Sequence, residues 1–387
     1  MAMEVKLLQP VKVVCTDDLG ETLVDIMQTA GYSRPLMVTD SFVGSMPLVV
    51  AARTKLEQVG VDVAVFDQVK PDPLCETVES GVEAFEAHKA DSIIAIGGGS
   101  SMDVARGINI VRVNGGSIIE YTDPAKPIAP CNGMIAVPTT AGTGSEMSNA
   151  LVVTEGSTGR KLAVLADPAV SEYAVLNADL MLTLPAKMTI ACGLDAFCHA
   201  AEGYLSRMAS PVTDAICEKA MFLLYNYLPR AVANGQDREA RERVMVASTL
   251  AGWMLNNAGT IAGHSIAHVL GAKYHIVHGE AVGYALPAVM EFVAPVRAHK
   301  VREIGQILGA VYPENAPDEQ VAIIASRAFK DFRDRMLGLH PVEDYGISVE
   351  ELVSNAQDVV DERFAGNTPR DIDLQAAEQL LEGFGSR

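Results

Sequence analysis

The sequence lacks the features that membrane proteins, secreted proteins and nucleic-acid-binding proteins need. None of its 387 residues belongs to an uninterrupted apolar run of about eighteen, and the N-terminal stretch has no apolar core of the kind found in secretory leaders. Basic residues are scarce, since 30 Lys and Arg stand against 49 Asp and Glu and give a formal net charge of -19. Because this charge repels phosphate backbones and anionic lipid surfaces, we expect no nucleic-acid partner and no membrane.

Cysteine is also sparse. The six cysteines form no CxxC pair and no dense framework, which favours reduced thiols in a cytoplasmic protein and argues against a closed structural zinc site. Apolar side chains, in contrast, are plentiful. A hydrophobic content of 49% is ample for a large core and suggests two domains.

The two halves of the chain show different periodicities. In the first half, short apolar runs rich in β-branched residues alternate with helical patterns, which predicts a mostly parallel sheet covered by helices on both faces. The predicted strands lie within residues 11–14, 36–40, 61–67, 92–98 and 134–140. Long amphipathic stretches follow, including residues 211–232 and 238–255. We therefore predict an α/β domain over residues 1–183 and a helical domain over residues 184–387.

The segment "DSIIAIGGGSSMDVARG" contains the fourth predicted strand and the glycine-rich turn that ends it. Gly97, Gly98 and Gly99 let the backbone approach a ligand closely, and a helix is expected to open near Ser100 or Ser101, where a serine can cap it. Exposed amides and the helix dipole would favour an anion such as a pyrophosphate. The spacing is neither GxGxxG nor GxxxxGK[ST], so a plain tight turn is the alternative.

Two further segments could contact a dinucleotide. Asp40 ends a predicted strand, where a carboxylate can accept hydrogen bonds from an adenosine ribose, although a solvated turn former would look the same. The loop "VPTTAGTGSE" offers several small donors suited to a phosphate or a nicotinamide amide. These donors are Thr139, Thr140, Thr143 and Ser145.

Histidines gather in the segment "GHSIAHVLGAKYHIVHG" of the second half. They are His264, His268, His275 and His278. His264 and His268 are four residues apart, as are Asp195 and His199, so each pair shares one helix face. A carboxylate with several imidazoles suits Fe²⁺ or Zn²⁺. The motif is not HExxH, because Ser265 follows His264, and His275 could either line a pocket or merely pack.

Taken together, these segments resemble the iron-containing (group III) alcohol dehydrogenase family. The segments "GGGSSMDVA", "PTTAGTGSE", "GLDAFCHAAEGYLS" and the histidine segment match its four signature regions in order and at the expected separations. The resemblance implies an α/β N-terminal dinucleotide-binding domain with a mostly parallel sheet and an all-α C-terminal metal-binding domain, the plan shared with dehydroquinate synthase-like proteins. Metal and nicotinamide would meet between the two domains.

The resemblance also implies roles for particular residues. Metal-ligand positions fall on Asp195, His199, His264 and His278, and the position of a histidine near the substrate falls on His268. Cofactor positions fall on Gly97, Gly98, Ser100, Thr139, Thr143 and Lys161, and the acid of members that use NAD falls on Asp40. We add Gly99, Asp103, Thr140 and Ser145 from the same segments as candidate cofactor residues. The chain departs from the usual family pattern at Asp72, Arg106, Phe197, Cys198 and Val277.

The implied activity is a metal-dependent hydride transfer between NAD(H) and a small aldehyde or primary alcohol. Fe²⁺, or alternatively Zn²⁺, would polarise the substrate oxygen, and NAD would carry the hydride. We predict His264, His278 and His268 as catalytic residues, with His268 relaying a proton. The resemblance further suggests a homo-oligomer, a dimer or larger.

Three alternatives remain open at this point. A glycerol dehydrogenase-like polyol dehydrogenase would share the same site. A dehydroquinate synthase-like lyase also uses NAD with a metal, but its polyanionic substrate requires several Lys or Arg, and the segments around the predicted metal site are nearly free of them. A non-catalytic NAD or metal sensor is disfavoured by an open, mixed set of metal ligands.

Overall fold

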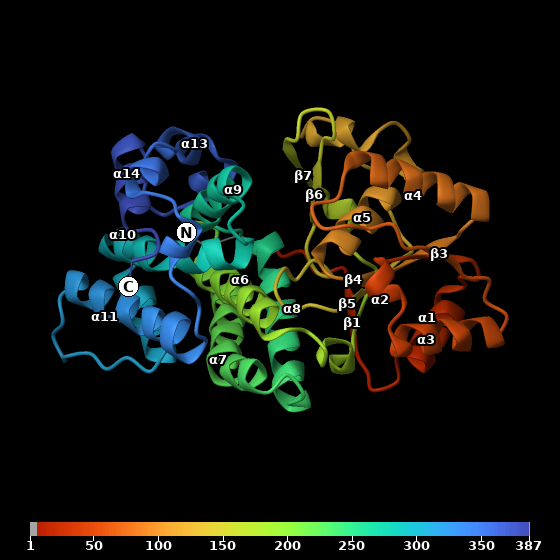
Figure 1. Cartoon of the computed structure of the whole chain (residues 1–387), viewed down its shortest axis with the longest axis horizontal. Coiled ribbons are helices and arrows are strands. Elements are labelled where there is room, and N and C mark those ends of the chain that lie inside the picture. Colours follow the sequence, from red (N-terminus) through yellow and green to blue (C-terminus); the bar gives the residue numbers. More distant parts are fainter. Residues whose placement is uncertain (1–5, 387) are drawn as a thin grey trace. The chain divides into compact units, whose positions relative to one another are not determined.

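The computed structural model describes residues 6–386, which divide into two compact units (Figure 1). The first unit is Leu8–Leu182, and the second comprises the chain from Thr183 onward together with the described residues before Leu8. None of the described helices is both long enough and apolar enough to cross a membrane.

The first unit is built on a six-stranded sheet in which every pairing is parallel. The strand order is β1-β8-β5-β4-β2-β3. The four inner strands are wholly buried, as expected of a sheet covered on both faces. The strands are β1 (Lys12–Cys15), β2 (Pro35–Val38), β3 (Ala64–Phe66), β4 (Ser92–Gly97), β5 (Met134–Pro138) and β8 (Tyr173–Leu176). The predicted α/β fold is confirmed, although β8 was not among the predicted strands.

Helices cover both faces of this sheet. One face carries α1 (Leu19–Ala30) and α3 (Pro47–Gln58), and the other carries α4 (Cys75–His88) and α5 (Gly99–Asn114). Strand periodicity divides the core accordingly, because Ile94 and Ile96 pack with α1 and α3 whereas Ile93 and Ala95 pack with α4 and α5. Near-continuous apolar strands therefore supply two separate cores.

The chain reverses its direction across the sheet between two neighbouring strands. β2 leads through α2 (Ser41–Gly44) and α3 outward to β3, whereas β4 leads through α5 in the opposite direction to β5. Such a reversal is a topological switch point, and open α/β sheets bind ligands there, outside the carboxyl ends of the strands. The segments that follow β2 and β4 are therefore placed for ligand binding.

An antiparallel hairpin and four short helices complete this unit. Its strands β6 (Ala150–Thr154) and β7 (Lys161–Leu165) bury alternate apolar side chains against the core around α5. The short helices are α2, η1 (Ile118–Thr122), η2 (Asp167–Ala169) and η3 (Ala178–Met181).

All the regular secondary structure described beyond residue 183 is helical, as predicted. The long helices are α6 (Ala186–Leu205), α7 (Pro211–Ala233), α8 (Arg238–Asn257), α9 (Ala262–Tyr274), α10 (His278–Ile307) and α11 (Asp318–Lys330). The shorter elements are η4 (Asp331–Met336), η5 (Val342–Tyr345), α12 (Val349–Val353), α13 (Ala356–Asp361), η6 (Arg363–Asn367) and α14 (Leu374–Glu382).

Helix α6 is the central helix of this unit. It packs against α7, α8 and α10, and its last three turns are almost entirely buried. A helix buried on all sides is normally apolar all round, but α6 carries Asp195, His199 and Glu202 at relative positions i, i+4 and i+7. These three residues form a polar stripe inside the core, so each needs a partner there.

Candidate metal centre and cofactor-binding edge

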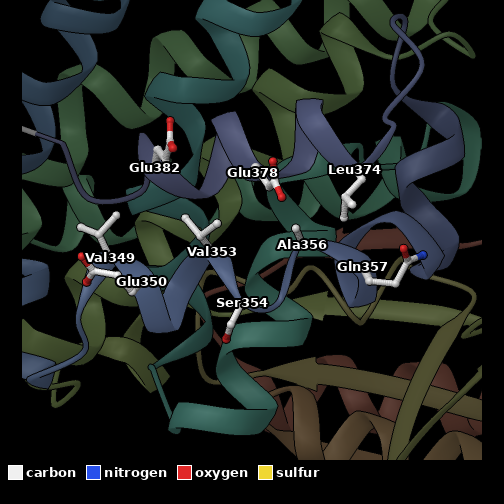
Figure 2. A pocket seen from close by; sticks show the side chains of 9 residues that line it. All are labelled: Val349, Glu350, Val353, Ser354, Ala356, Gln357, Leu374, Glu378 and Glu382. Carbon is white, nitrogen blue, oxygen red and sulfur yellow. The ribbon is translucent and has the colours of Figure 1, made fainter.

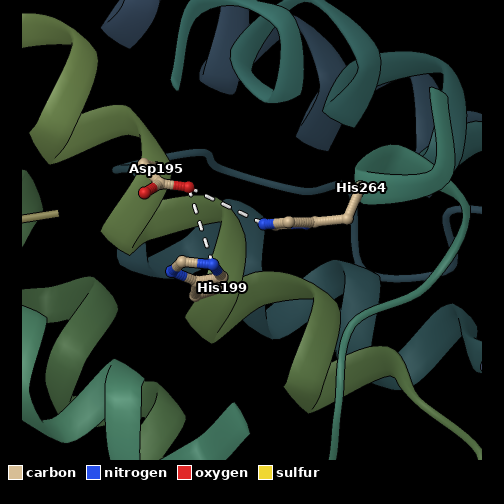
Figure 3. Close-up of side chains that lie close together, drawn as sticks. All are labelled: Asp195, His199 and His264. Atoms are coloured by element: carbon tan, nitrogen blue, oxygen red, sulfur yellow. Dashed lines mark ion pairs between the residues drawn. The ribbon is translucent and has the colours of Figure 1, made fainter. Parts of the chain in front are cut away.

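The four predicted metal-ligand residues come together around one carboxylate oxygen. Asp195 Oδ1 lies 3.5 Å from His199 Nε2, 3.7 Å from His264 Nε2 and 3.5 Å from His278 Nε2. Asp195 and His199 project from α6, His264 from the first turn of α9, and His278 is the first residue of α10 (Figure 3 shows the first three side chains). Three separate helices thus direct imidazole nitrogens toward the same oxygen.

The donor atoms of this cluster fit a divalent cation. Asp195 Oδ1 and His264 Nε2 are buried and have no hydrogen-bond partner. Leaving such atoms unsatisfied is costly, and a cation would satisfy both at once. Candidate ligand atoms of Asp195, His199 and His264 all lie within 4.8 Å of one another. A mixed nitrogen and oxygen set of this kind suits Fe²⁺ or Zn²⁺.

The electrostatics of the cluster favour an ionised carboxylate. Burial alone would raise the pKa of Asp195, but the imidazoles of His199, His278 and His264 outweigh it and hold that pKa well below its usual range. Desolvation lowers the pKa of His278, although the negative charge of Asp195 acts to raise it. Burial would also lower the pKa of His264, yet the carboxylates of Glu202 and Asp195 raise it. Because a ligand imidazole must be neutral, a cation would displace a proton from His264.

Two carboxylates that the sequence analysis did not single out contact the histidines. Glu202 Oε1 lies 2.8 Å from His264 Nδ1, and the Glu202 side chain is fully buried. Its position at i+7 from Asp195 is the only sequence signal that could have identified it. Glu362 Oε1 lies 3.1 Å from His268 Nδ1, and Glu362 is too distant in the sequence for any local pattern to indicate this contact.

His268 lies beside the cluster on the same helix as His264. Its ring stacks on that of His278 with centroids 5.4 Å apart, and its side chain is 37% exposed, so it can meet a small molecule. Its partner Glu362 also accepts hydrogen bonds from Ser265 Oγ and Phe364 N, at 2.7 and 2.8 Å. His275 ends α9 in the left-handed conformation and is exposed rather than packed.

The glycine-rich turn and the threonine-rich loop leave neighbouring strand ends and lie in contact. Gly97 pairs with Pro138 in the sheet, and Thr139 N donates a hydrogen bond to Gly97 O. A Cβ on Gly98 would lie 3.3 Å from Thr140 Oγ1, and one on Gly99 would lie 3.0 Å from Thr143 Cγ2. A Cβ at either position would be in tight contact with a threonine side chain, so glycine favours the close approach of these two segments.

The start of α5 corrects one expectation. The helix begins at Gly99, with Gly98 as its N-cap residue and no side-chain cap, so the predicted serine cap at Ser100 or Ser101 is wrong. Gly97 has φ 156°, and a Cβ there would lie 2.2 Å from Ser101 Oγ. The serine hydroxyl packs against the turn instead of capping the helix, and the first amides of α5 remain suited to an anion.

Asp40 follows β2 at the switch point. Its Oδ1 accepts hydrogen bonds from Phe42 N and Val43 N, both at 2.9 Å, and so caps α2. The side chain therefore forms a turn, as the alternative interpretation proposed. A role toward a ribose would have to use Oδ2.

The side chains of Lys161 and Asp103 both have partners within the first unit. Lys161 Nζ lies 2.6 Å from Asp72 Oδ1. Asp103 Oδ2 accepts a hydrogen bond of 3.2 Å from Val152 N, and burial raises the pKa of its carboxyl to about 7. Both residues thereby connect the hairpin β6-β7 to the rest of the unit.

Arg106 holds the far end of the threonine-rich loop. Its fully buried guanidinium donates to Ser145 O at 2.6 Å, Ala150 O at 2.5 Å and Ala169 O at 3.2 Å. Three backbone carbonyls from different segments thus meet on one planar donor group. The sequence marked Arg106 only as a departure from the family pattern.

A surface pocket of about 540 Å³ lies apart from the histidine cluster, among α12, α13 and α14 (Figure 2). Its lining includes Val349, Leu374 and the carboxylates of Glu350, Glu378 and Glu382. None of the cluster residues lines it, and it brings no imidazole or cation to its carboxylates.

The same class of fold is found in solved oxidoreductases. The structure of sulfoacetaldehyde reductase from Bifidobacterium kashiwanohense in complex with NAD⁺ aligns with a TM-score of 0.87 and 26% identity, covering 100% of each chain. A family model described as iron-containing alcohol dehydrogenase matches residues 10–178, and a model of the C-terminal part of that family matches residues 189–384. The chain belongs to the iron-containing alcohol dehydrogenase family, which confirms the resemblance inferred from its motifs.

Two characterised relatives cover nearly the whole chain. The chain is 34% identical over 362 residues to the NAD-dependent methanol dehydrogenase of Bacillus methanolicus. This match covers 92% of this chain and 93% of the relative. It is 32% identical over 364 residues to lactaldehyde reductase of Escherichia coli strain K12, with 92% and 94% covered.

Proposed function

We propose that this enzyme transfers a hydride between NAD(H) and a small aldehyde or primary alcohol, with a divalent metal held by Asp195, His199, His264 and His278. The main observation in support of this proposal is that three imidazole nitrogens lie 3.5 to 3.7 Å from Oδ1 of Asp195. A bound Fe²⁺ or Zn²⁺ would act as a Lewis acid on the substrate oxygen, while NADH supplies the hydride.

The remaining chemistry is a proton transfer, which we assign to His268. Its Nδ1 faces the Glu362 carboxylate, which only accepts hydrogen bonds when ionised, so the proton of the neutral ring resides on Nδ1. Nε2 is then the atom that exchanges a proton with the substrate oxygen or with a water beside it. Glu362 fixes the ring in this orientation.

We assign NAD binding to the carboxyl edge of the sheet. The amides of Gly97, Gly98 and Gly99 and the start of α5, with Ser100, would bind the pyrophosphate. The loop residues Thr139, Thr140, Thr143 and Ser145 would complete the cofactor site, together with Asp103 of the glycine-rich segment and Lys161 at the start of β7. Asp40 Oδ2 would accept from the adenosine ribose and disfavour the 2′-phosphate of NADP.

We further propose a cytoplasmic homo-oligomer, a dimer or larger. All six cysteines are free thiols, which suits a reducing compartment. The oligomeric state rests on the family resemblance, and light scattering of the purified enzyme would measure it.

The test of the proposed function combines metal analysis with a substrate panel. The enzyme is purified with and without oxygen, its metal content is measured, and NADH oxidation is followed with short aldehydes and with hydroxyketones derived from polyols. We expect a stoichiometric divalent metal and turnover with short aldehydes. A stronger preference for the polyol-derived ketones would instead favour a polyol dehydrogenase. Full turnover after verified removal of the metal would refute the Lewis-acid role.

A further inference from the structure

Glu202 is a fully buried carboxylate inside the helical unit. It lies on α6, one turn beyond His199, and completes the polar stripe that begins at Asp195. A buried carboxylate is costly unless hydrogen bonds compensate for its lost hydration. The hydrogen bonds of Glu202 therefore indicate its role in the protein.

Those bonds all go to the first turn of α9. Glu202 Oε1 lies 2.8 Å from His264 Nδ1, and Oε2 accepts hydrogen bonds from Ile261 N at 2.7 Å and from His264 N at 3.3 Å. One carboxylate thus binds both the ring and the backbone of the same histidine. The rotation of the imidazole and the position of its helix are set together.

This arrangement also determines which ring nitrogen of His264 can bind a cation. An ionised carboxylate has no hydrogen to donate, so the ring proton must be on Nδ1. Nε2 then carries the free lone pair, and it is the atom that lies 3.7 Å from Asp195 Oδ1.

The neighbouring sequence makes room for this carboxylate. A Cβ at position 263 would lie 2.4 Å from Glu202 Oε1, a distance that no side chain could occupy without displacing the carboxylate. Gly263 therefore permits the contact between Glu202 and His264.

We propose that Glu202 is the positioning residue of the metal site: it holds His264 as the Nδ1-H tautomer with Nε2 directed at the cation. This inference rests on the proposed metal site. Carboxylates that orient a ligand histidine in this way commonly account for about 10 to 100-fold in metal affinity or activity. Glu202 and Asp195 also bring two negative charges, which offset the two positive charges of a divalent cation in a buried site.

The first test measures zinc affinity by competition with a chelator, starting from metal-free enzyme. Glu202→Gln keeps the shape of the side chain but removes its charge, and it should weaken zinc binding by about 10 to 100-fold. Gly263→Ala should weaken it in the same direction by displacing the carboxylate. The matched control is Glu303→Gln, which removes another carboxylate bonded to α6, at Tyr204, without touching a ligand residue. It should leave zinc affinity unchanged.

A second readout distinguishes positioning from general structural support. Nitrogen-15 spectra of labelled histidine in the zinc-loaded wild-type enzyme should show His264 protonated at Nδ1, and cobalt-loaded Glu202→Gln should show an altered visible absorption spectrum. The wild-type measurement stands even if Glu202→Gln does not fold. Protonation of His264 at Nε2, or wild-type zinc affinity and an unchanged cobalt spectrum in Glu202→Gln, would overturn the proposal.

Asp195→Ala separates this inference from the function on which it rests. If Asp195→Ala loses the metal while Glu202→Gln keeps it, the site is correct and the role of Glu202 is wrong. If Asp195→Ala also keeps wild-type affinity, the proposed metal site itself is wrong.

Discussion

Replacing Arg106 by lysine should loosen the loop that we assign to cofactor binding. The guanidinium donates to three backbone carbonyls, with the bonds to Ser145 O and Ala169 O buried and the bond to Ala150 O part-buried, whereas a lysine ammonium on its single flexible stem is expected to reach one of them. Each of the two carbonyls left without a partner costs about 1 to 3 kcal/mol. The N-terminal unit should therefore lose about 2 to 6 kcal/mol, a large share of the roughly 5 to 15 kcal/mol that stabilises a typical domain.

The loss of these hydrogen bonds should also weaken cofactor binding, because Arg106 binds the carbonyls of Ser145 and Ala150 at the end of the threonine-rich loop. If ordering the loosened loop costs about 1.4 kcal/mol of the free energy of cofactor binding, KM for NADH rises about tenfold. Urea unfolding, proteolysis within residues 145–150 and NADH kinetics would measure these effects. Zinc affinity should not change, because the ligand residues belong to the other unit.

The control for this prediction is Arg112→Lys on the same helix. Arg112 donates to Asn109 and to Asn132 O and makes no bond to the threonine-rich loop, so its replacement should leave KM for NADH unchanged. Wild-type stability and wild-type KM in Arg106→Lys would refute the reasoning. Equal rises of KM in both variants would show that the effect does not pass through the loop.

Three further predictions concern single side chains. Asp195→Ala should weaken metal binding by about 10 to 100-fold or more, and elemental analysis showing full metal content would contradict the ligand assignment. Asp40→Asn should keep the cap of α2, because asparagine caps helices equally well, while its lost charge raises kcat/KM for NADPH relative to NADH. An unchanged ratio would mean that Asp40 does not face the ribose. Glu362→Gln should lower kcat about tenfold or more with metal content and KM for NADH unaltered, since it leaves His268 less well oriented for proton transfer. Wild-type kcat would exclude that role.

Much of the site was predictable because its signals are local. The four-residue spacing of Asp195 and His199, and of His264 and His268, is a property of any helix that contains them. Strand periodicity and the glycine run likewise depend only on neighbours in the chain. These patterns indicated an α/β unit, a helical unit and a group of candidate metal ligands, whereas the choice of Asp195, His199, His264 and His278 among the candidates came from the family resemblance.

Where local signals are weak, the interpretation from sequence was incomplete or wrong. β8 was not predicted, although it pairs with both β1 and β5. The serine cap of α5 was predicted from residue preference, whereas the backbone of Gly97 and the packing of Ser101 determine how that helix begins. In both cases, contacts outside the segment outweighed its intrinsic preference.

The sequence by itself thus determined which residue types lie on which helix face and which strands are buried. Only the tertiary structure decided that β2 and β4 are neighbours at a switch point, and that α6, α9 and α10 meet at one carboxylate oxygen. It also decided that Glu202 and Glu362 orient His264 and His268. Periodicity is set by the backbone within one element, whereas strand order and side-chain partners depend on the burial of segments that are far apart along the chain.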